Sequence, residues 1–364
     1  MGKILQRIEE LSGGNCFQTE RYTLDHFVPP EYQDKDEEFH RDKVFETDNP
    51  KKKKVQLHFD GVASPLFSYF LDGSRRTYKI VDFGSTDGKF LPIVAGQIGA
   101  AVCYRQHKKL KPYALKRANV LAIPDRMAVD LKTMSDEISG IVQHHLSIDN
   151  VLQYKTKKHA DRPFENLAIA KIQTTMMDME VELIREMVKS NKLATNQMLM
   201  IDGSLQFSGV KDEHIIFQNV VGVSKSFNPN LQGILRSKNR EIGSYLTDLE
   251  FGERTAVYVY EVEGKKAART KIGAWYLRIH PKENMKKPLD GVIKIEKIAT
   301  QRHEQEEGFD TDMINEISRS ILLERNVTCY GNDDRWANHL YSIYLTELYL
   351  KNSFVSDMYF LNIF

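Results

Sequence analysis

Residues 197–205 read QMLMIDGSL, the segment most informative about the fold. An unbroken apolar run closed by Asp202 and Gly203 is typical of a buried strand that ends in a sharp turn. A carboxylate at the end of such a strand projects from the edge of the sheet, where open α/β folds bind their ligands. Asp202 is therefore a candidate residue for a functional site.

A second segment repeats this pattern. Residues 66–74 read LFSYFLDGS, so that Asp72, Gly73 and Ser74 follow another apolar run. A single Asp-Gly-Ser is usually only a turn. Two copies after apolar strands also fit a shared metal site, because Mg²⁺ and Mn²⁺ prefer oxygen ligands and a pair of such ions can clamp a scissile phosphate. Spacing alone leaves the turn and the metal-site interpretations open.

Hydrophobic periodicity along the rest of the chain predicts one α/β domain with a mixed sheet. Runs of β-branched and aromatic residues predict antiparallel neighbouring strands at 66–71, 76–83 and 90–104, and later strands at 215–223, 255–262, 271–279 and 291–298. Apolar residues at helical spacing predict helices at 3–11, 127–150, 164–190, 310–324 and 335–350.

Composition limits the function classes. The 51 Lys and Arg residues nearly balance the 50 Asp and Glu residues, for a formal net charge of +1, so any DNA-binding surface must be a local patch. Cys16, Cys103 and Cys329 lack metal-ligand spacing, which argues against a disulfide framework or a structural zinc site and favours a reducing, cytoplasmic setting. No secretory signal is evident, and no segment approaches the roughly 20 apolar residues that span a membrane.

The first 60 residues differ in character from the remainder, and we divide the chain into an N-terminal extension, 1–60, and a main domain, 61–364. Residues 28–54 are polar and end in four lysines, which predicts either a solvated loop or a phosphate-contacting arm. The apolar face of the 3–11 helix, with Ile4, Leu5 and Ile8, either docks a partner or a second copy, or packs on its own domain.

Several short motifs, taken in order, resemble those of the NurA nucleases. The order and rough spacing agree from about residue 66 to 350. The matching segments are Asp72-Gly73-Ser74-Arg75, the LMIDGSL of 199–205, Gly222-Val223-Ser224-Lys225-Ser226, Tyr276-Leu277-Arg278 and Trp336-Ala337-Asn338-His339-Leu340. One departure is that residues 330–334, before the closing histidine, lack the proline usual in the family.

The resemblance implies a ribonuclease H-like α/β fold, a mixed sheet flanked by helices with N-terminal and peripheral additions. It also implies a DNA nuclease that uses Mn²⁺ or Mg²⁺. The mechanism that we expect is phosphodiester hydrolysis with two ions, one activating water and the other stabilising the leaving 3′-oxygen. Family members form homodimers and work with HerA, a hexameric ATPase that translocates DNA, in DNA end processing or antiphage defence.

Carried over residue by residue, the resemblance assigns Asp72 and Asp202 as metal ligands, with a glutamate from the preceding helix. Glu180 borders the apolar stripe of that helix and is favoured, with Glu182 as the alternative. Lys225 and His339 are expected to neutralise or protonate groups around the phosphate. An ordinary surface role is the competing interpretation for Lys225, and a satisfied or exposed residue for His339.

Two other functions fit the same residues. One is a metal phosphoesterase that acts on a substrate other than DNA. The other is a non-catalytic ribonuclease H-like adaptor that docks an ATPase motor, although the presence of both motif aspartates argues against it. The sequence has no P-loop of the GxxxxGK[ST] type, so the chain is not itself the motor.

Overall fold

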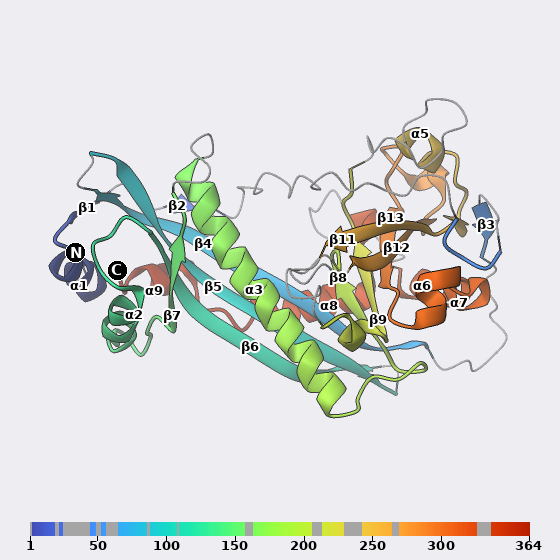
Figure 1. Cartoon of the computed structure of the whole chain (residues 1–364), viewed down its shortest axis with the longest axis horizontal. Coiled ribbons are helices and arrows are strands. Elements are labelled where there is room, and N and C mark those ends of the chain that lie inside the picture. Colours follow the sequence, from blue (N-terminus) through green and yellow to red (C-terminus); the bar gives the residue numbers. More distant parts are fainter. Residues whose placement is uncertain are drawn as a thin grey trace.

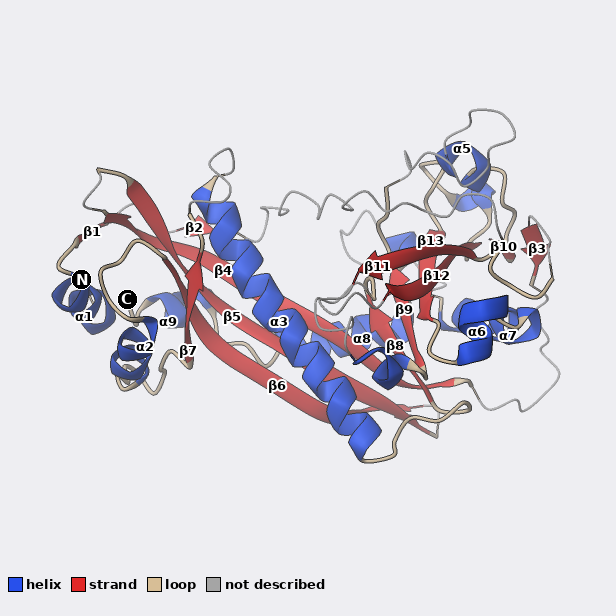
Figure 2. Ribbon diagram, in the orientation of Figure 1, coloured by secondary structure: helices blue, strands red, loops and turns tan. Residues whose placement is uncertain are grey.

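The computed structural model confirms the predicted fold class, an α/β fold in which helices flank one large mixed sheet (Figures 1 and 2). The sheet has the strand order β3-β10-β12-β13-β9-β8-β4-β5-β6-β7, with β1, β2 and β11 paired beside this path. The structure describes residues 2–18, 22–24, 44–48, 52–55, 65–85, 88–107, 109–156, 163–205, 213–228, 242–263, 269–325 and 336–364.

Three long antiparallel strands form one half of the sheet: β4 (Phe67–Gly84), β5 (Phe90–Gln106) and β6 (Lys109–Pro124). The long helix α3 (Phe164–Lys189) crosses one face of these strands, and α8 (Tyr341–Lys351) packs on the other (Figure 1). Two glycines of β5 permit this close packing, because a Cβ at Gly96 would meet Ile172 of α3 and a Cβ at Gly99 would meet Leu350 of α8.

The second half of the sheet begins where β8 (Met198–Asp202) runs parallel to β4 and β9 (Val220–Ser224) runs parallel to β8. Antiparallel strands follow in the order β13 (Val292–Ile298), β12 (Arg269–Arg278), β10 (Glu253–Thr255) and β3 (Lys52–Lys54), with β11 (Tyr258–Glu263) also on β12. At the other end, β7 (Asn150–Tyr154) pairs with β6, and β1 (Asn15–Phe17) and β2 (Tyr22–Thr23) pair with β4.

The remaining helices are α1 (Lys3–Ser12), α2 (Leu131–Ser139), α5 (Ile242–Leu246), α6 (Arg302–Glu307), α7 (Thr311–Glu324) and α9 (Asp357–Leu361). Short 3₁₀ turns lie at η1 (His214–Phe217), η2 (Lys282–Asn284) and η3 (Trp336–Asn338). None of the helices in the described ranges is long and apolar enough to cross a membrane.

The prediction that Asp72-Gly73-Ser74 closes a strand is wrong. Residues 67–84 form one continuous strand, because Gly73 and Ser74 keep extended backbone and pair with Ala100 and Gly99 of β5. The Asp-Gly pair therefore lies inside a strand rather than in a turn.

Two other predicted elements change, and one long strand was missed. The helix expected at 127–150 ends at Ser139, because Gly140 follows it and His144 and His145 adopt left-handed backbone in a tight turn. Part of the strand expected at 215–223 is the 3₁₀ turn η1. The long strand β6 was not predicted at all, because its exposed first half is rich in lysine.

The described part of the lysine run is a strand rather than a loop. Residues 52–54 form the edge strand β3, paired with β10. Lys52 forms an ion pair with Glu253, and charged side chains of this kind protect a sheet edge from further pairing. Lys51 and most of the predicted loop, as well as residues 330–334 and Cys329, lie outside the described residues; Cys16 and Cys103 are free thiols.

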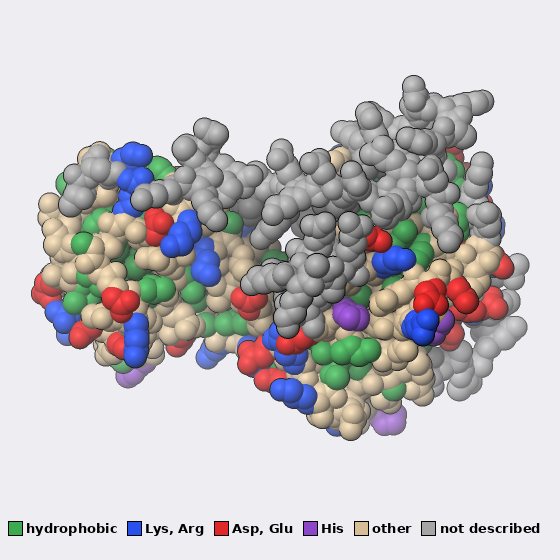
Figure 3. Space-filling model, in the orientation of Figure 1, with side chains coloured by type: hydrophobic (Ala, Val, Ile, Leu, Met, Phe, Trp, Pro, Cys, Tyr) green, Lys and Arg blue, Asp and Glu red, His purple; other side chains and the backbone are tan. Residues whose placement is uncertain are grey.

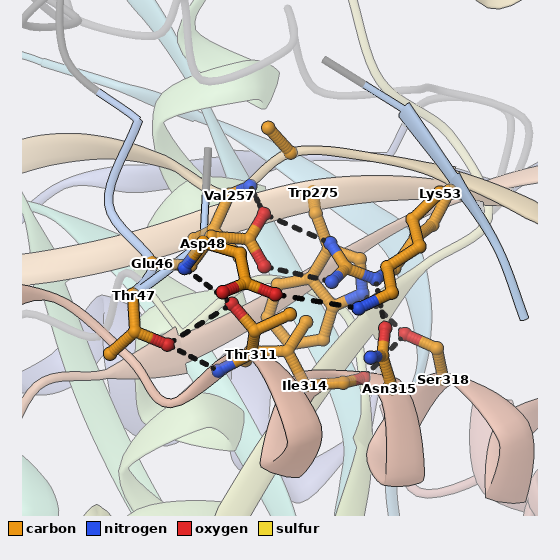
Figure 4. Close-up of polar contacts among 12 residues, drawn as sticks. Glu46, Thr47, Asp48, Lys53, Val257, Trp275, Thr311, Ile314, Asn315 and Ser318 are labelled. Atoms are coloured by element: carbon orange, nitrogen blue, oxygen red, sulfur yellow. Dashed lines mark hydrogen bonds and ion pairs between the residues drawn. The ribbon is translucent and has the colours of Figure 1, made fainter. Parts of the chain in front are cut away.

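A buried ion pair fixes the segment that precedes β3 (Figure 4). Both oxygens of Glu46 accept hydrogen bonds from the Arg254 guanidinium of β10, at 3.1 and 2.8 Å, and both side chains are fully buried. Glu46 also accepts from the Val257 backbone, and Arg254 donates to Asn315 of α7. Because the pair is well hydrogen-bonded, the desolvation cost of two buried charges is largely offset.

The apolar face of α1 is buried within its own chain. Ile4, Leu5 and Ile8 have at most 1% of their surface exposed and share a core cluster with Tyr78 of β4 and Phe360 of α9. The expectation that these side chains are exposed for a partner is therefore wrong, and the alternative in which the helix packs on its own chain is the one that the structure shows.

Candidate metal centre

Asp72 and Asp202 lie side by side on parallel neighbouring strands. The register pairs Leu71 of β4 with Ile201 of β8, so each aspartate is the next residue along its strand. Leu71 and Ile201 share one core cluster, and the residues before them belong to the cluster on the other face. Because side chains alternate along a strand, both aspartates point to the same face as Phe70 and Met200. This is the face on which α8 packs.

Glu180 lies on α3, which packs on the opposite face of the sheet from the two aspartate side chains. Its side chain is buried, and a Cβ at Gly73 would lie only 2.3 Å from its Oε1 atom. The missing side chain at Gly73 therefore gives the Glu180 carboxylate room next to Asp72. The alternative residue, Glu182, pairs with Lys116 and is 55% exposed. Glu180 is therefore the acid of this helix that lies against β4, and it acts on Asp72 and Asp202 through its charge.

The cluster of acids is short of positive charge. Burial, the Asp202 charge and the Glu347 charge raise the pKa of Asp72 well above its ordinary value. Burial and the Asp202 charge raise the pKa of Glu180 to about 8. The Oδ2 atom of Asp72 is buried and accepts no hydrogen bond from any residue that the structure describes. An additional cation would stabilise all three carboxylates.

Lys225 supplies the nearest positive charge. It follows β9, and its Nζ atom donates to Oδ2 of Asp202 at 2.7 Å. Burial alone would lower the pKa of Lys225, but Asp202, Glu347 and Asp72 outweigh it and raise the pKa, so the ammonium stays charged. Asn338 fixes the backbone of Lys225, because its Nδ2 atom donates to the Lys225 carbonyl at 2.9 Å.

His339 lies beside the cluster, but not on a helix as predicted. It occupies the connection between η3 and α8, where it is buried with its ring 6.1 Å from that of Tyr344. His339 also interacts electrostatically with Glu347, because its charge helps to lower the pKa of the Glu347 carboxyl.

Glu347 of α8 is a charged neighbour of the site that the sequence did not reveal. Burial raises its pKa, but a hydrogen bond from Lys351 and the charge of Lys225 bring the pKa below its ordinary value. Its ionised carboxylate in turn acts on Asp72. In the sequence this residue looks like any half-exposed helix glutamate, and only the packing of α8 on β4 brings it to the site.

The chemistry of the two aspartates suits a divalent cation, although the acids are not grouped around one point. Buried carboxylates with an unsatisfied oxygen are the donors that Mg²⁺ and Mn²⁺ take. Within the described ranges, no three His, Cys, Asp or Glu side chains are grouped closely enough to hold one ion as they stand. The Lys225 ammonium, which pairs with Oδ2 of Asp202, supplies positive charge beside that carboxylate.

No protein-family model and no curated protein matches the sequence. Among solved structures, the chain is similar to the crystal structure of the NurA nuclease from Sulfolobus solfataricus, with a TM-score of 0.43 and 11% sequence identity. The similarity covers 82% of this chain and 81% of that chain. Likeness at this level transfers no residue roles.

Proposed function

We propose that this chain is a divalent-metal-dependent nuclease that hydrolyses phosphodiester bonds in DNA at a site built around Asp72 and Asp202. The observation that carries the proposal is the position of these two aspartates on adjacent parallel strands, with an unsatisfied oxygen on Asp72. The buried Glu180 lies against Gly73 on the opposite face of the sheet. The order of the motifs, which resembles that of the NurA nucleases, supports the choice of DNA as substrate.

In this proposal, Asp72, Asp202 and Glu180 hold one or two Mn²⁺ or Mg²⁺ ions. Bound cations supply activation of the attacking water and stabilisation of charge on the phosphate. The Lys225 ammonium is charged and fixed through its backbone by Asn338, so it is suited to neutralising a phosphate oxygen. His339 holds or delivers a proton near the leaving oxygen.

The experiment that tests the proposal is a Mn²⁺-dependent cleavage assay on duplex and single-stranded DNA. Asp72→Asn and Asp202→Asn are expected to abolish cleavage while circular dichroism shows an unchanged fold. Glu182→Gln is the matched control, since this exposed acid pairs with Lys116 away from the cluster. Cleavage at the wild-type rate by either aspartate variant would show the assignment to be wrong.

The same assay separates the other two functions. A metal phosphoesterase with another substrate would hydrolyse a small phosphodiester such as bis(p-nitrophenyl) phosphate in an Asp72-dependent manner but leave DNA intact. A non-catalytic adaptor would bind no Mn²⁺ and cleave neither.

We further propose a homodimer that works with a HerA-like hexameric ATPase in DNA end processing or antiphage defence. Lys and Arg side chains lie interspersed with Asp and Glu on the described part of the face in Figure 3, and the net charge is +1. General attraction for DNA is therefore weak, and a partner that delivers the DNA strand would raise the local concentration of that strand.

Light scattering after size exclusion at micromolar concentration should give twice the 42.1 kDa chain mass. A monomer would count against the dimer, and cleavage that the ATPase leaves unstimulated would count against the partnership.

A further inference from the structure

The backbone after Asp202 folds sharply across the neighbouring strand. Gly203 has a φ of +112°, which favours glycine, and its amide donates to the Val223 carbonyl of β9 at 2.8 Å. The turn then passes over Gly222, where an added Cβ would lie 2.8 Å from both the Gly203 carbonyl oxygen and Cγ of Leu205. The turn thus crosses β9 at the one place where the strand has no side chain in its way.

The turn ends on Glu296, a residue of β13 that stands opposite Gly222. Oε2 of Glu296 accepts from the Ser204 hydroxyl at 2.7 Å and from the Leu205 amide at 2.8 Å. Oε1 accepts from the Tyr260 hydroxyl at 2.8 Å and pairs with Lys294 at 2.7 Å. Glu296 is fully buried, and both of its carboxylate oxygens have hydrogen-bond or ion-pair partners. Its side chain is therefore held in one position.

We propose that Glu296 is a positioning residue, which grips the Ser204-Leu205 turn from β13 and thereby fixes the direction of the Asp202 carboxylate. This inference rests on the proposed function, because it assigns Asp202 as a cation ligand. Asp202 already has Lys225 bound to one oxygen, so its backbone must resist that attraction when the carboxylate turns to a cation. A ligand held by such an outer contact loses affinity when the contact is removed.

A purely structural role for Glu296 is the competing explanation, and the chain offers a matched control. Glu304 is also buried, accepts from the Thr300 and Gln301 amides at 2.9 and 3.0 Å, and pairs with a lysine of β13, Lys297. It caps α6 rather than the turn after β8. Glu304→Gln should therefore cost stability as Glu296→Gln does, without touching the Asp202 turn.

The experiment combines Mn²⁺ binding by calorimetry with hydrogen exchange of the backbone over residues 198–205, at a temperature where each variant is folded. We expect Glu296→Gln to weaken Mn²⁺ binding by about ten-fold and to speed exchange of the Leu205 amide. We expect Glu304→Gln to leave both unchanged. If Glu296→Gln does not fold, Ser204→Ala removes one of the two bonds to Oε2 and should shift both readouts in the same direction.

Two results would overturn the inference: unchanged exchange over 198–205 in the Glu296 variant, or faster exchange with wild-type Mn²⁺ affinity, which would make Glu296 merely structural. If the wild-type protein bound no Mn²⁺, the proposed function itself would fall, together with the role of Asp202 as a ligand. Hydrogen exchange, which needs no metal, would then still report whether Glu296 holds the turn.

Discussion

Burial of Glu180 beside Asp202 has a cost that the metal-free protein cannot avoid. The carboxyl must either keep its proton or be ionised in a place that lacks enough positive charge. Its pKa of about 8 in the folded protein, against 4.5 for the ordinary group, means that the folded state holds this proton at neutral pH while the unfolded chain releases it. The stability linked to Glu180 is therefore full below about pH 4.5 and is lost as pH rises toward 8.

This linkage predicts the behaviour of Glu180→Gln in EDTA. The neutral amide cannot ionise, so the variant should gain free energy of unfolding relative to wild type as pH rises from 5 to 8, by roughly 2–4 kcal/mol at pH 8. Urea unfolding at pH 5, 6.5 and 8 measures the difference. Glu182→Gln on the same helix should follow the wild-type curve, because that residue is exposed and paired with Lys116. Parallel curves for Glu180→Gln and wild type would mean that Glu180 is not buried as an acid.

The sequence revealed individual site residues only where their chemistry and the local sequence pattern coincide. Asp72 and Asp202 stood out because each follows an apolar run and precedes a glycine. Glu347, Asn338 and Glu296 did not, because the parts of the site on which they act are far away along the chain. Asn338, for example, donates to the carbonyl of Lys225, which is 113 residues earlier. Only the tertiary fold gives such residues a role.

The strand β4 shows how one element can carry both a core and a site. The strand continues through Asp72 and Gly73 because β5 pairs with it residue by residue, whereas local propensity favours a turn at Asp-Gly. The helix α3, by contrast, was predicted almost to the residue, since its apolar stripe repeats over 26 residues without a breaker. Tertiary pairing overrides a local turn signal more readily than it overrides a long periodic one.

The contact between β4 and α3 predicts the effect of Gly73→Ala. The new methyl group would overlap the Glu180 carboxyl group at Oε1 and Cδ, and it would lie 3.0 Å from Cε of Met176. These atoms are at the far ends of flexible side chains. The fold should survive with a loss of about 1 kcal/mol, but the Glu180 carboxylate must move away. We expect Mn²⁺ affinity and DNA cleavage to fall as far as they do in Glu180→Gln.

A double-mutant cycle tests whether the effect passes through Glu180. In the Glu180→Gln background, Gly73→Ala should cause little further loss of Mn²⁺ affinity, because the two changes remove the same interaction. Gly140→Ala is the control, since the nearest atoms to its new methyl group lie at an ordinary 3.6 Å. Fully additive losses would show that Gly73 acts on the site by another route.

At the scale of the whole molecule, the two ends of the chain close one end of the sheet. The N- and C-termini lie together in Figure 1, and an added Cβ at Gly2 would lie 2.4 Å from the backbone of Phe364. Helices α1 and α9 share the core cluster that covers Ile80 of β4. The amphipathic pattern of α1 predicted a buried face, but an apolar stripe does not specify whether its own chain, a second copy or a partner covers it.

This arrangement separates stability from the candidate site, and Ile8→Ala tests the separation. Ile80 lies eight residues along β4 from Asp72, or about 26 Å at ~3.3 Å per residue, so the α1 cluster and the acids are far apart in the same strand. Removing three carbons from a fully buried isoleucine should lower the free energy of unfolding by about 2–4 kcal/mol. Mn²⁺ affinity and the rate of DNA cleavage, measured well below the melting temperature, should stay at wild-type values.

Arg7→Ala on the same helix is the control, because its ion pairs with Glu10 and Glu137 are exposed to solvent and the melting temperature should hardly change. If instead Ile8→Ala left stability intact and changed the mass seen by light scattering, the face of α1 would be covered by another copy of the chain rather than by its own core.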